Sequence, residues 1–129
     1  LTFGAFGQMP AEMIDHNAPR PVPPAEDATA AYGEFLVTVG VCRDCHTPNL
    51  AGGRPAPSDP WAPNLTPGGE LAGWTQADFV NTIRTGVTPS GRELNPMMPW
   101  ESYRNMTDAE LQAIWLYLQS LPAQASNEG

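Results

Sequence analysis

The stretch Cys42-Arg43-Asp44-Cys45-His46 places two cysteines two residues apart, with a histidine directly after the second. Each thiol can add to one vinyl group of a haem, and the short spacing lets one backbone turn reach both vinyl groups. The histidine that follows then lies below the iron and can offer an imidazole nitrogen as the proximal ligand. The stretch therefore predicts one covalently attached haem c, with Cys42 and Cys45 as attachment residues and His46 as an iron ligand.

Cysteines at this spacing also occur in zinc sites and in redox dithiols. A structural zinc ion usually has four protein ligands, and the one other histidine of the chain is His16. A redox dithiol belongs beside a β-α-β pattern, and the sequence contains no such pattern. Both readings stay open as alternatives, and haem attachment is the stronger interpretation.

Composition limits the partners that the chain can bind. Its 129 residues fit one domain, and 14 acidic against 6 basic residues give a net charge of -8. Nucleic acid and an anionic membrane surface are therefore poor partners. All six basic residues are arginines, which excludes both a lysine ligand to the iron and a ring of docking lysines around a haem edge.

Three features of the sequence bear on the cellular compartment in which the protein works. No apolar run is long enough to cross a bilayer, no signal peptide is visible, and the first residue is Leu1 rather than methionine. We interpret the chain as a processed protein or an excised domain. Because haem is attached through thioethers outside the cytoplasm, the expected location is the periplasm or the extracytoplasmic face of a membrane.

Three segments repeat apolar residues with the period of a helix. The first runs from about 28 to 39, with Asp27 as its N-cap. Gly33 lies inside it at a cost of about 1 kcal/mol, which indicates close approach by another helix. The second runs from about 76 to 85 and the third from about 108 to 121.

Both later helices begin with a capping box, in which the N-cap side chain and the third helical residue bond each other's backbone. Thr75 with Asp78 forms a variant of this box, and Thr107 with Glu110 forms the usual one. Gly86 follows the second helix as a stop signal.

Proline-rich segments join the predicted helices. Residues 47–73 and 87–106 are predicted to be loops, and no segment predicts a strand. We expect an all-α fold with three main helices and long proline-rich loops around one covalent haem. Residues 1–26 are predicted as an extended arm or linker that packs on the domain, 27–122 as the domain and 123–129 as a flexible tail.

The iron also needs a sixth ligand or an open position. The candidates are His16 and the five methionines. Met98 is favoured, because Pro99 biases it towards extended backbone that can hold a side chain out from the loop. A thioether ligand raises the reduction potential. Met97 and an open site stay as alternatives, as does a core-filling role for both methionines.

The order of these features resembles a class I cytochrome c. Helix, C-x-x-C-H, proline-rich loop, helix, Met98-Pro99-Trp100 and terminal helix match it over about residues 28–122. The chain is similar to bacterial domains found with dehydrogenases and respiratory complexes. The resemblance implies that the first helix crosses the third near Gly33, with Trp115 or Tyr117 nearby.

The resemblance also implies contacts to the haem. Pro48 is expected to pack against His46 and orient it. The full set of expected haem-contact residues, besides the two cysteines, is Pro48, Asn64, Thr66, Trp74, Arg84 and Trp100. Other roles compete with this one: turn formation for Asn64 and Thr66, core packing for Trp74 and an exposed helix face for Arg84.

The expected function is one-electron transfer by a haem ligated by His46 and Met98, in a respiratory or dehydrogenase-linked chain. Such a protein is a carrier rather than an enzyme, and its redox donor and acceptor dock transiently at the haem edge. It could be free, tethered or part of a membrane complex. A haem with an open or labile sixth site, peroxidase-like or gas-binding, is the alternative, and a metal module without haem is the third.

Overall fold

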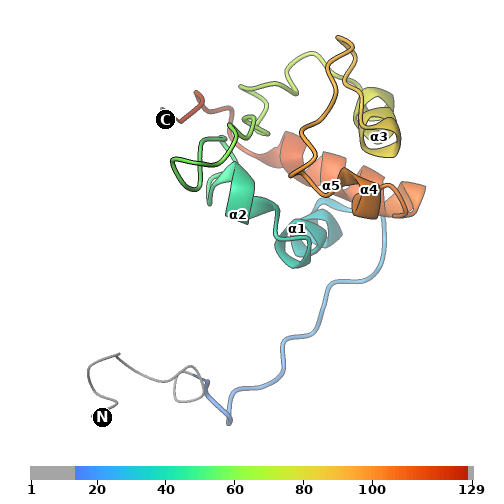
Figure 1. The fold of residues 1–129 in the computed structure, drawn as a ribbon. Coiled ribbons are helices and arrows are strands. Elements are labelled where there is room, and N and C mark those ends of the chain that lie inside the picture. Colours follow the sequence, from blue (N-terminus) through green and yellow to red (C-terminus); the bar gives the residue numbers. More distant parts are fainter. Residues whose placement is uncertain (1–13, 128–129) are drawn as a thin grey trace, which may run out of the picture.

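The computed structural model describes residues 14–127, and the regular structure in that range is helical (Figure 1). Extended pairing in these residues is limited to two isolated bridges, Gly53 with Ala62 and Val87 with Glu93. This confirms the all-α prediction. The helices are α1 (Ala30–Val39), α2 (Cys42–His46), α3 (Gln76–Thr85), α4 (Trp100–Tyr103) and α5 (Asp108–Ser120).

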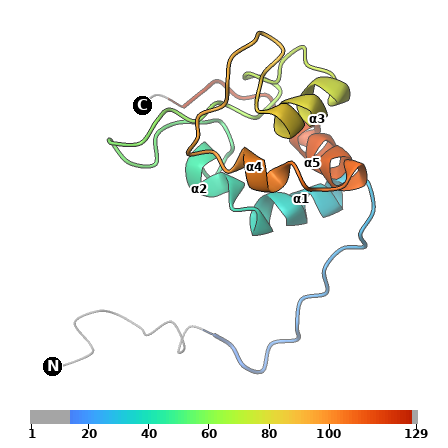
Figure 2. The ribbon, with the colours of Figure 1, turned by 45° about the vertical axis from the view of Figure 1, so that its right-hand side comes forward.

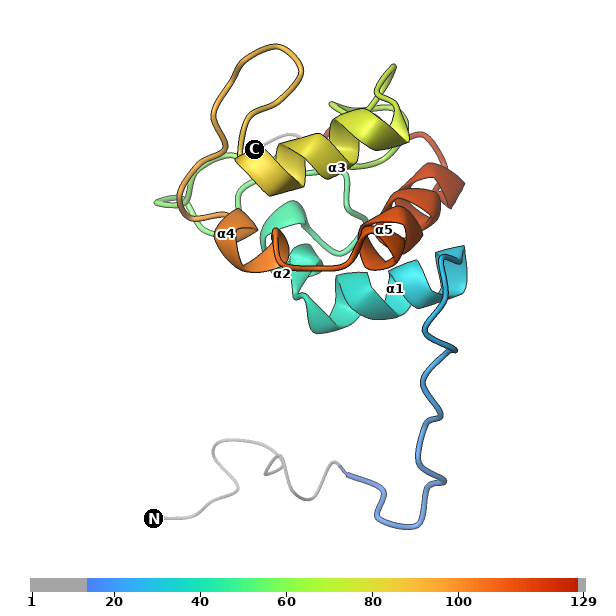
Figure 3. The ribbon, with the colours of Figure 1, turned by 90° about the vertical axis from the view of Figure 1, so that its right-hand side faces the viewer.

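Helix α5 lies between α1 and α3 (Figures 1 and 3). It crosses α1 at Gly33, where an added Cβ would stand 1.9 Å from the carbonyl oxygen of Ala113 and 2.8 Å from Cβ of Tyr117. No side chain fits there, so glycine is required for the two backbones to touch. The crossing expected near Gly33, with Tyr117 beside it, is confirmed.

The helix ends follow the capping signals closely. Both predicted capping boxes are present, at Thr75 for α3 and at Thr107 for α5. The start of α1 differs, because Thr29 rather than Asp27 is the N-cap and accepts a hydrogen bond from the backbone of Tyr32. The Asp27 carboxylate instead accepts a hydrogen bond from the adjacent backbone N–H of Ala28. The helix therefore begins later than predicted.

Two short helices have no counterpart among the three predicted ones. Helix α2 is a single turn made of the C-x-x-C-H residues, and α4 lies in the segment 87–106 that the sequence predicts as loop. One turn is too short to show an apolar period, so its sequence carries no helical signal.

The core forms where α1, α3 and α5 meet. Phe79 of α3 and Trp115 of α5 pack with ring centroids 5.6 Å apart and ring planes tilted by 34°. Loop residues complete the core from the side of the C-x-x-C-H turn. The buried apolar residues are Tyr32, Leu36, Val37, Leu50, Ala51, Leu71, Phe79, Ile83, Leu111, Ala113, Ile114, Trp115 and Leu118.

The segment before α1 does not pack as expected in its described part. Residues 14–26 are mostly exposed, Val22 to 90%, and this segment runs away from the helices (Figure 2). The apolar residues on which the packing expectation rested lie outside the described residues: Phe3, Phe6, Met9 and Met13.

The segment after α5 also differs from expectation. Residues 124–127 form hydrogen bonds to two loops, whereas the sequence predicts a flexible tail. The partners lie some 60 to 80 positions earlier in the chain. The local sequence therefore could not predict these contacts. In residues 14–127, no helix combines the length and the apolar character that a bilayer crossing needs.

Candidate haem site

Helix α2 presents the three residues of the attachment motif on one turn. Cys42 is partly buried, Cys45 is exposed, and both are free thiols. Positive backbone φ angles bound the turn, 53° at Val41 before it and 70° at Thr47 after it. Such angles cost side-chain-bearing residues about 1 to 3 kcal/mol each and persist only where the surrounding structure holds them.

His46 has the form of a metal ligand. It is 7% exposed, and its Nδ1 lies 2.8 Å from the carbonyl oxygen of Pro63. A carbonyl can only accept, so Nδ1 carries a proton, and in the neutral imidazole Nε2 then keeps its lone pair. Burial lowers the pKa of His46, while the Pro63 carbonyl and Glu70 act in the opposite direction. The neutral imidazole with a fixed tautomer suits iron ligation.

Arg43, inside the motif, fastens α2 to the rest of the molecule. Its Nη2 donates to the hydroxyl of Tyr117 in α5 at 2.5 Å, and its Nε donates to the carbonyl of Pro48 at 3.2 Å. Pro48 is exposed. The hydrogen bond that orients His46 is donated by its Nδ1 to the carbonyl of Pro63, a residue that the sequence did not single out. The expected packing of Pro48 on His46 stays a prediction.

The two methionines before Pro99 differ in burial. Met97 is 62% exposed, whereas Met98 is partly buried and packs against the core. The backbone N–H of Met98 donates to the carbonyl of Asn95, and its carbonyl accepts from Trp100 N–H. This tight turn directs the two side chains differently, and it favours Met98 over Met97 as a ligand.

The loop that carries Met98 is fastened beside the attachment motif. Trp100 packs over Gly86, where an added Cβ would lie 2.6 Å from the indole. Tyr103, at the end of α4, donates its hydroxyl to the carbonyl of Gly40, two residues before Cys42. This bond ties the end of α4 to the link between α1 and α2, and the start of α4 packs against the end of α3.

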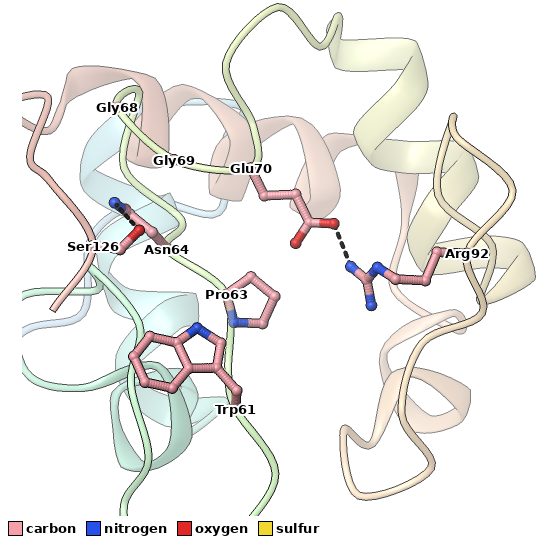
Figure 4. A pocket seen from close by; sticks show the side chains of 8 residues that line it. All are labelled: Trp61, Pro63, Asn64, Gly68, Gly69, Glu70, Arg92 and Ser126. Carbon is pink, nitrogen blue, oxygen red and sulfur yellow. Dashed lines mark hydrogen bonds and ion pairs between the residues drawn. The ribbon is translucent and has the colours of Figure 1, made fainter. Parts of the chain in front are cut away.

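A hollow of about 570 Å³ opens next to the His46 loop (Figure 4). Pro63, whose carbonyl meets His46, is one wall of it. Arg92 pairs with Glu70 across the hollow, and the indole of Trp61 faces it from below. Its lining residues are Trp61, Pro63, Asn64, Gly68, Gly69, Glu70, Arg92 and Ser126.

Asn64 and Thr66, two of the expected haem contacts, are buried and bonded within the protein. The Asn64 Oδ1 accepts from the Thr66 hydroxyl at 2.7 Å, and its Nδ2 donates to the carbonyl of Gln124 at 2.9 Å. The Thr66 hydroxyl also accepts from the backbone N–H of Gln124. Their polar groups hold loop and tail together, which agrees with the competing turn-forming role.

Arg84 and Trp74 also have protein partners. Arg84 donates to the carbonyls of Met106, at 2.5 Å, and Arg104, and pairs with Asp108 at 2.8 Å. Its guanidinium braces α3 against the turn between α4 and α5. Trp74 packs against the core. Neither arrangement favours a haem contact, and their expected roles towards the haem stay predictions.

Within residues 14–127, no group of three or more histidine, cysteine, aspartate or glutamate side chains could hold a metal ion. The donor set on α2 is two cysteines and one buried histidine. That set fits a c-type haem, which needs two thiols on one turn and one imidazole.

A protein-family model described as "Cytochrome C oxidase, cbb3-type, subunit III" matches residues 25–118. The chain belongs to this cytochrome c family. The match begins before α1 and ends within α5, so it includes the attachment motif, the Met98 loop and every lining residue of the hollow except Ser126. Membership of this family identifies the domain as an electron carrier.

Curated relatives place similar domains in dehydrogenases. The domain is 34% identical to a nicotinate dehydrogenase subunit of Pseudomonas putida, over 68% of this chain and 8% of that protein. It is 31% identical to the gluconate 2-dehydrogenase cytochrome c subunit of Pantoea cypripedii, over 72% and 23%. It is 28% identical to the fructose dehydrogenase cytochrome subunit of Gluconobacter japonicus, over 86% and 24%. The chain therefore spans less than a quarter of the length of these relatives.

Proposed function

We propose that this cytochrome c domain carries one haem, attached through Cys42 and Cys45 and ligated by His46 and Met98, and passes single electrons between redox proteins. The observation that carries the proposal is the buried His46, whose Nδ1 lies against the Pro63 carbonyl. Next to it stand two free thiols on the same turn. The partial burial of Met98 and the fastening of its loop to Gly40 support the second ligand.

The chain's own residues set the conditions for transfer. The bound haem supplies the one-electron chemistry of iron. His46 donates a neutral imidazole whose direction the Pro63 carbonyl holds. Met98 offers a soft, uncharged thioether that favours the ferrous state and raises the potential. With His46 and Met98 both bound to it, the iron would be closed to substrates, and electrons would be exchanged at the edge of the haem.

Arg92 is our candidate to meet the carboxylates of the haem. It is the arginine that lines the hollow beside the His46 loop, and its present partner there is Glu70 (Figure 4). A propionate would share this guanidinium with Glu70, because the group has five N–H donors. Asn64, Thr66, Trp74, Arg84 and Trp100, the residues expected from the resemblance, would contribute through packing or through the loops they hold.

The setting is also a proposal. The named relatives are subunits of dehydrogenases, which supports a donor that is a dehydrogenase and an acceptor in a respiratory chain. Thioether attachment takes place outside the cytoplasm, so we place the domain in the periplasm or on the extracytoplasmic face of a membrane complex.

The ligand assignment is tested by replacing each methionine of the loop. Met98→Ala should lower the midpoint potential by on the order of 0.1 to 0.3 V, part of the range of about 0.8 V that axial ligands span. The weak near-infrared band of methionine-ligated ferric haem should disappear as well. Met97→Ala, the matched control on an exposed side chain, should change neither. An unchanged potential in Met98→Ala would overturn the assignment.

Attachment is tested on a denaturing gel stained for haem. The unaltered chain should retain the stain, and Cys42→Ala together with Cys45→Ala should lose it. A chain matured in a periplasm that shows no covalent haem would overturn the proposed function as a whole.

A further inference from the structure

The segment 124–127, here called the strap, crosses the two loops that hold His46. We propose that the strap is a positioning device that keeps the Pro63 carbonyl on His46 Nδ1 and so lowers the reduction potential of the iron. The inference rests on the proposed function, because it requires that His46 be an iron ligand. It assigns a redox role to residues that touch neither the iron ligand nor the attachment cysteines.

One end of the strap binds the loop that follows His46. The Asn127 Nδ2 donates to the carbonyl of Gly52 at 2.7 Å, to Asn49 Oδ1 at 2.9 Å and to the hydroxyl of Thr47 at 3.0 Å. The backbone N–H of Asn127 donates to the carbonyl of Ala51 at 3.2 Å. The two hydrogens of this one amide are thus shared among three acceptors of one loop. The first turn of that loop has a positive φ at each end, at Thr47 and at Leu50.

The other end binds the loop that carries Pro63. The Gln124 carbonyl accepts from Asn64 Nδ2 at 2.9 Å, and its N–H donates to the Thr66 hydroxyl at 3.2 Å. Gly68 packs so closely on the strap that an added Cβ would lie 2.4 Å from the Gln124 carbonyl oxygen. Asn64 is 3% exposed and follows Pro63 directly, so its anchoring restrains the peptide plane of the Pro63 carbonyl.

The two loops meet at His46. Gly52 N–H donates to the backbone carbonyl of His46 at 3.0 Å, and Gly53 pairs with Ala62 through bonds of 2.9 and 2.8 Å. An added Cβ at Gly52 would stand 2.5 Å from the Ala62 carbonyl oxygen. Pro63 therefore lies between Ala62, held by the first loop, and Asn64, held by the strap. The strap ties both ends of this arrangement together.

The hydrogen bond that the strap maintains affects the iron through the imidazole. A carbonyl that accepts from Nδ1–H makes Nε2 a stronger electron donor, and stronger donation stabilises ferric iron. When the strap is loosened, the Nδ1–H···O bond should lengthen and open more often. The potential should then rise, and the Nδ1 proton should exchange faster with water.

The test uses the full haem-loaded chain and three asparagine-to-alanine substitutions. Asn127→Ala releases the first loop, and Asn64→Ala releases the second. Asn105→Ala is the matched control, because Asn105 is exposed and its side chain makes one long bond, of 3.4 Å, to the Glu101 carbonyl. The measurements are the midpoint potential and the exchange rate of the His46 Nδ1 proton by NMR in the reduced protein.

We expect Asn127→Ala and Asn64→Ala each to raise the midpoint potential. Each should also speed exchange of the Nδ1 proton by about tenfold, because the free energy that protects this proton from water falls by roughly the contribution of one hydrogen bond. Asn105→Ala should match the unaltered chain in both. If Asn127→Ala lowers thermal stability but keeps the original potential and exchange rate, the strap is only structural and the inference is overturned. That result leaves the proposed function intact, whereas lack of covalent haem in the unaltered chain overturns the function first.

Discussion

Val41, directly before Cys42, is the least expected residue of the attachment turn. It is β-branched, yet its backbone lies in the left-handed region, with φ 53° and ψ 29°. A β-branched side chain at a positive φ is a steric outlier. The side chain is 56% exposed, so burial does not compensate for the strain. Contacts around the turn, above all those of Arg43 and Tyr103, must hold it in place.

Replacing Val41 with asparagine should therefore stabilise the protein. Asparagine tolerates the left-handed region better than other side-chain-bearing residues, and the relief should be about 1 kcal/mol in the free energy of unfolding. Chemical denaturation of the haem-loaded protein measures it. Val39→Asn is the control, because Val39 is equally exposed, at 58%, but lies in α1. A gain of the same size at Val39 would contradict the strain argument.

Between elements, the crossing of α1 and α5 depends on the missing side chain of Gly33. The backbone of Ala113 occupies the space that a Cβ would need. Because a backbone atom moves only with its whole helix, the clash is not relieved by a change of rotamer. The same contact sets the direction in which α1 leads into Gly40 and α2.

Gly33→Ala should lower the free energy of unfolding by about 3 kcal/mol, the upper part of the range for overpacking, despite the better helix propensity of alanine. Thermal or denaturant unfolding followed by circular dichroism measures the loss. Glu34→Ala, on the exposed side of the same helix, should change stability by less than about 0.5 kcal/mol. A neutral Gly33→Ala would show that the helices can separate at no cost.

Arg84 links a second pair of elements, α3 and the turn before α5. Arg84→Met should lower the free energy of unfolding by about 1 to 2 kcal/mol, because the carbonyls of Arg104 and Met106 lose a charged donor. The midpoint potential should stay the same, because the guanidinium binds these partners rather than the haem. Asp108→Ala should have little effect, since Asp108 is 90% exposed and exposed ion pairs contribute little. A large shift of potential in Arg84→Met would instead favour a haem contact.

At the scale of the whole molecule, charge governs how the domain meets its partners. The net charge is -8 and the chain contains no lysine, and haem propionates would make the charge more negative. Partners that dock quickly should therefore present basic or neutral surfaces, because like charges slow diffusional encounter.

Electron exchange with small inorganic reagents should show this charge directly. Oxidation of the reduced protein by anionic ferricyanide should become faster as ionic strength rises, because salt screens the repulsion between like charges. Oxidation by a cationic cobalt complex should become slower over the same range. Stopped-flow absorption measures both rates, and equal slopes for the two reagents would show that the local field at the haem edge differs from what the net charge predicts.

The sequence by itself predicted the chemistry of attachment and determined the main helices. The spacing of Cys42, Cys45 and His46 is a local pattern that occurs in few kinds of site. The capping boxes at Thr75 and Thr107 can each be recognised within four residues. Gly33 could be interpreted because a glycine inside an apolar helix usually marks a close contact with another backbone. Each of these signals lies within one or two turns of backbone, where geometry follows directly from residue order.

The tertiary structure decided what surrounds that chemistry. It shows that His46 donates to Pro63, that Arg43 donates to Tyr117, and that Arg84 donates to two backbone carbonyls. It also shows that the segment expected to be a flexible tail is the strap, which bonds to Asn64 and to the loop after His46. These partners are separated by about 17 to 80 positions in the chain. Such contacts depend on how whole elements pack, and a polar side chain in a sequence has the same donors and acceptors whichever partner the fold brings to it.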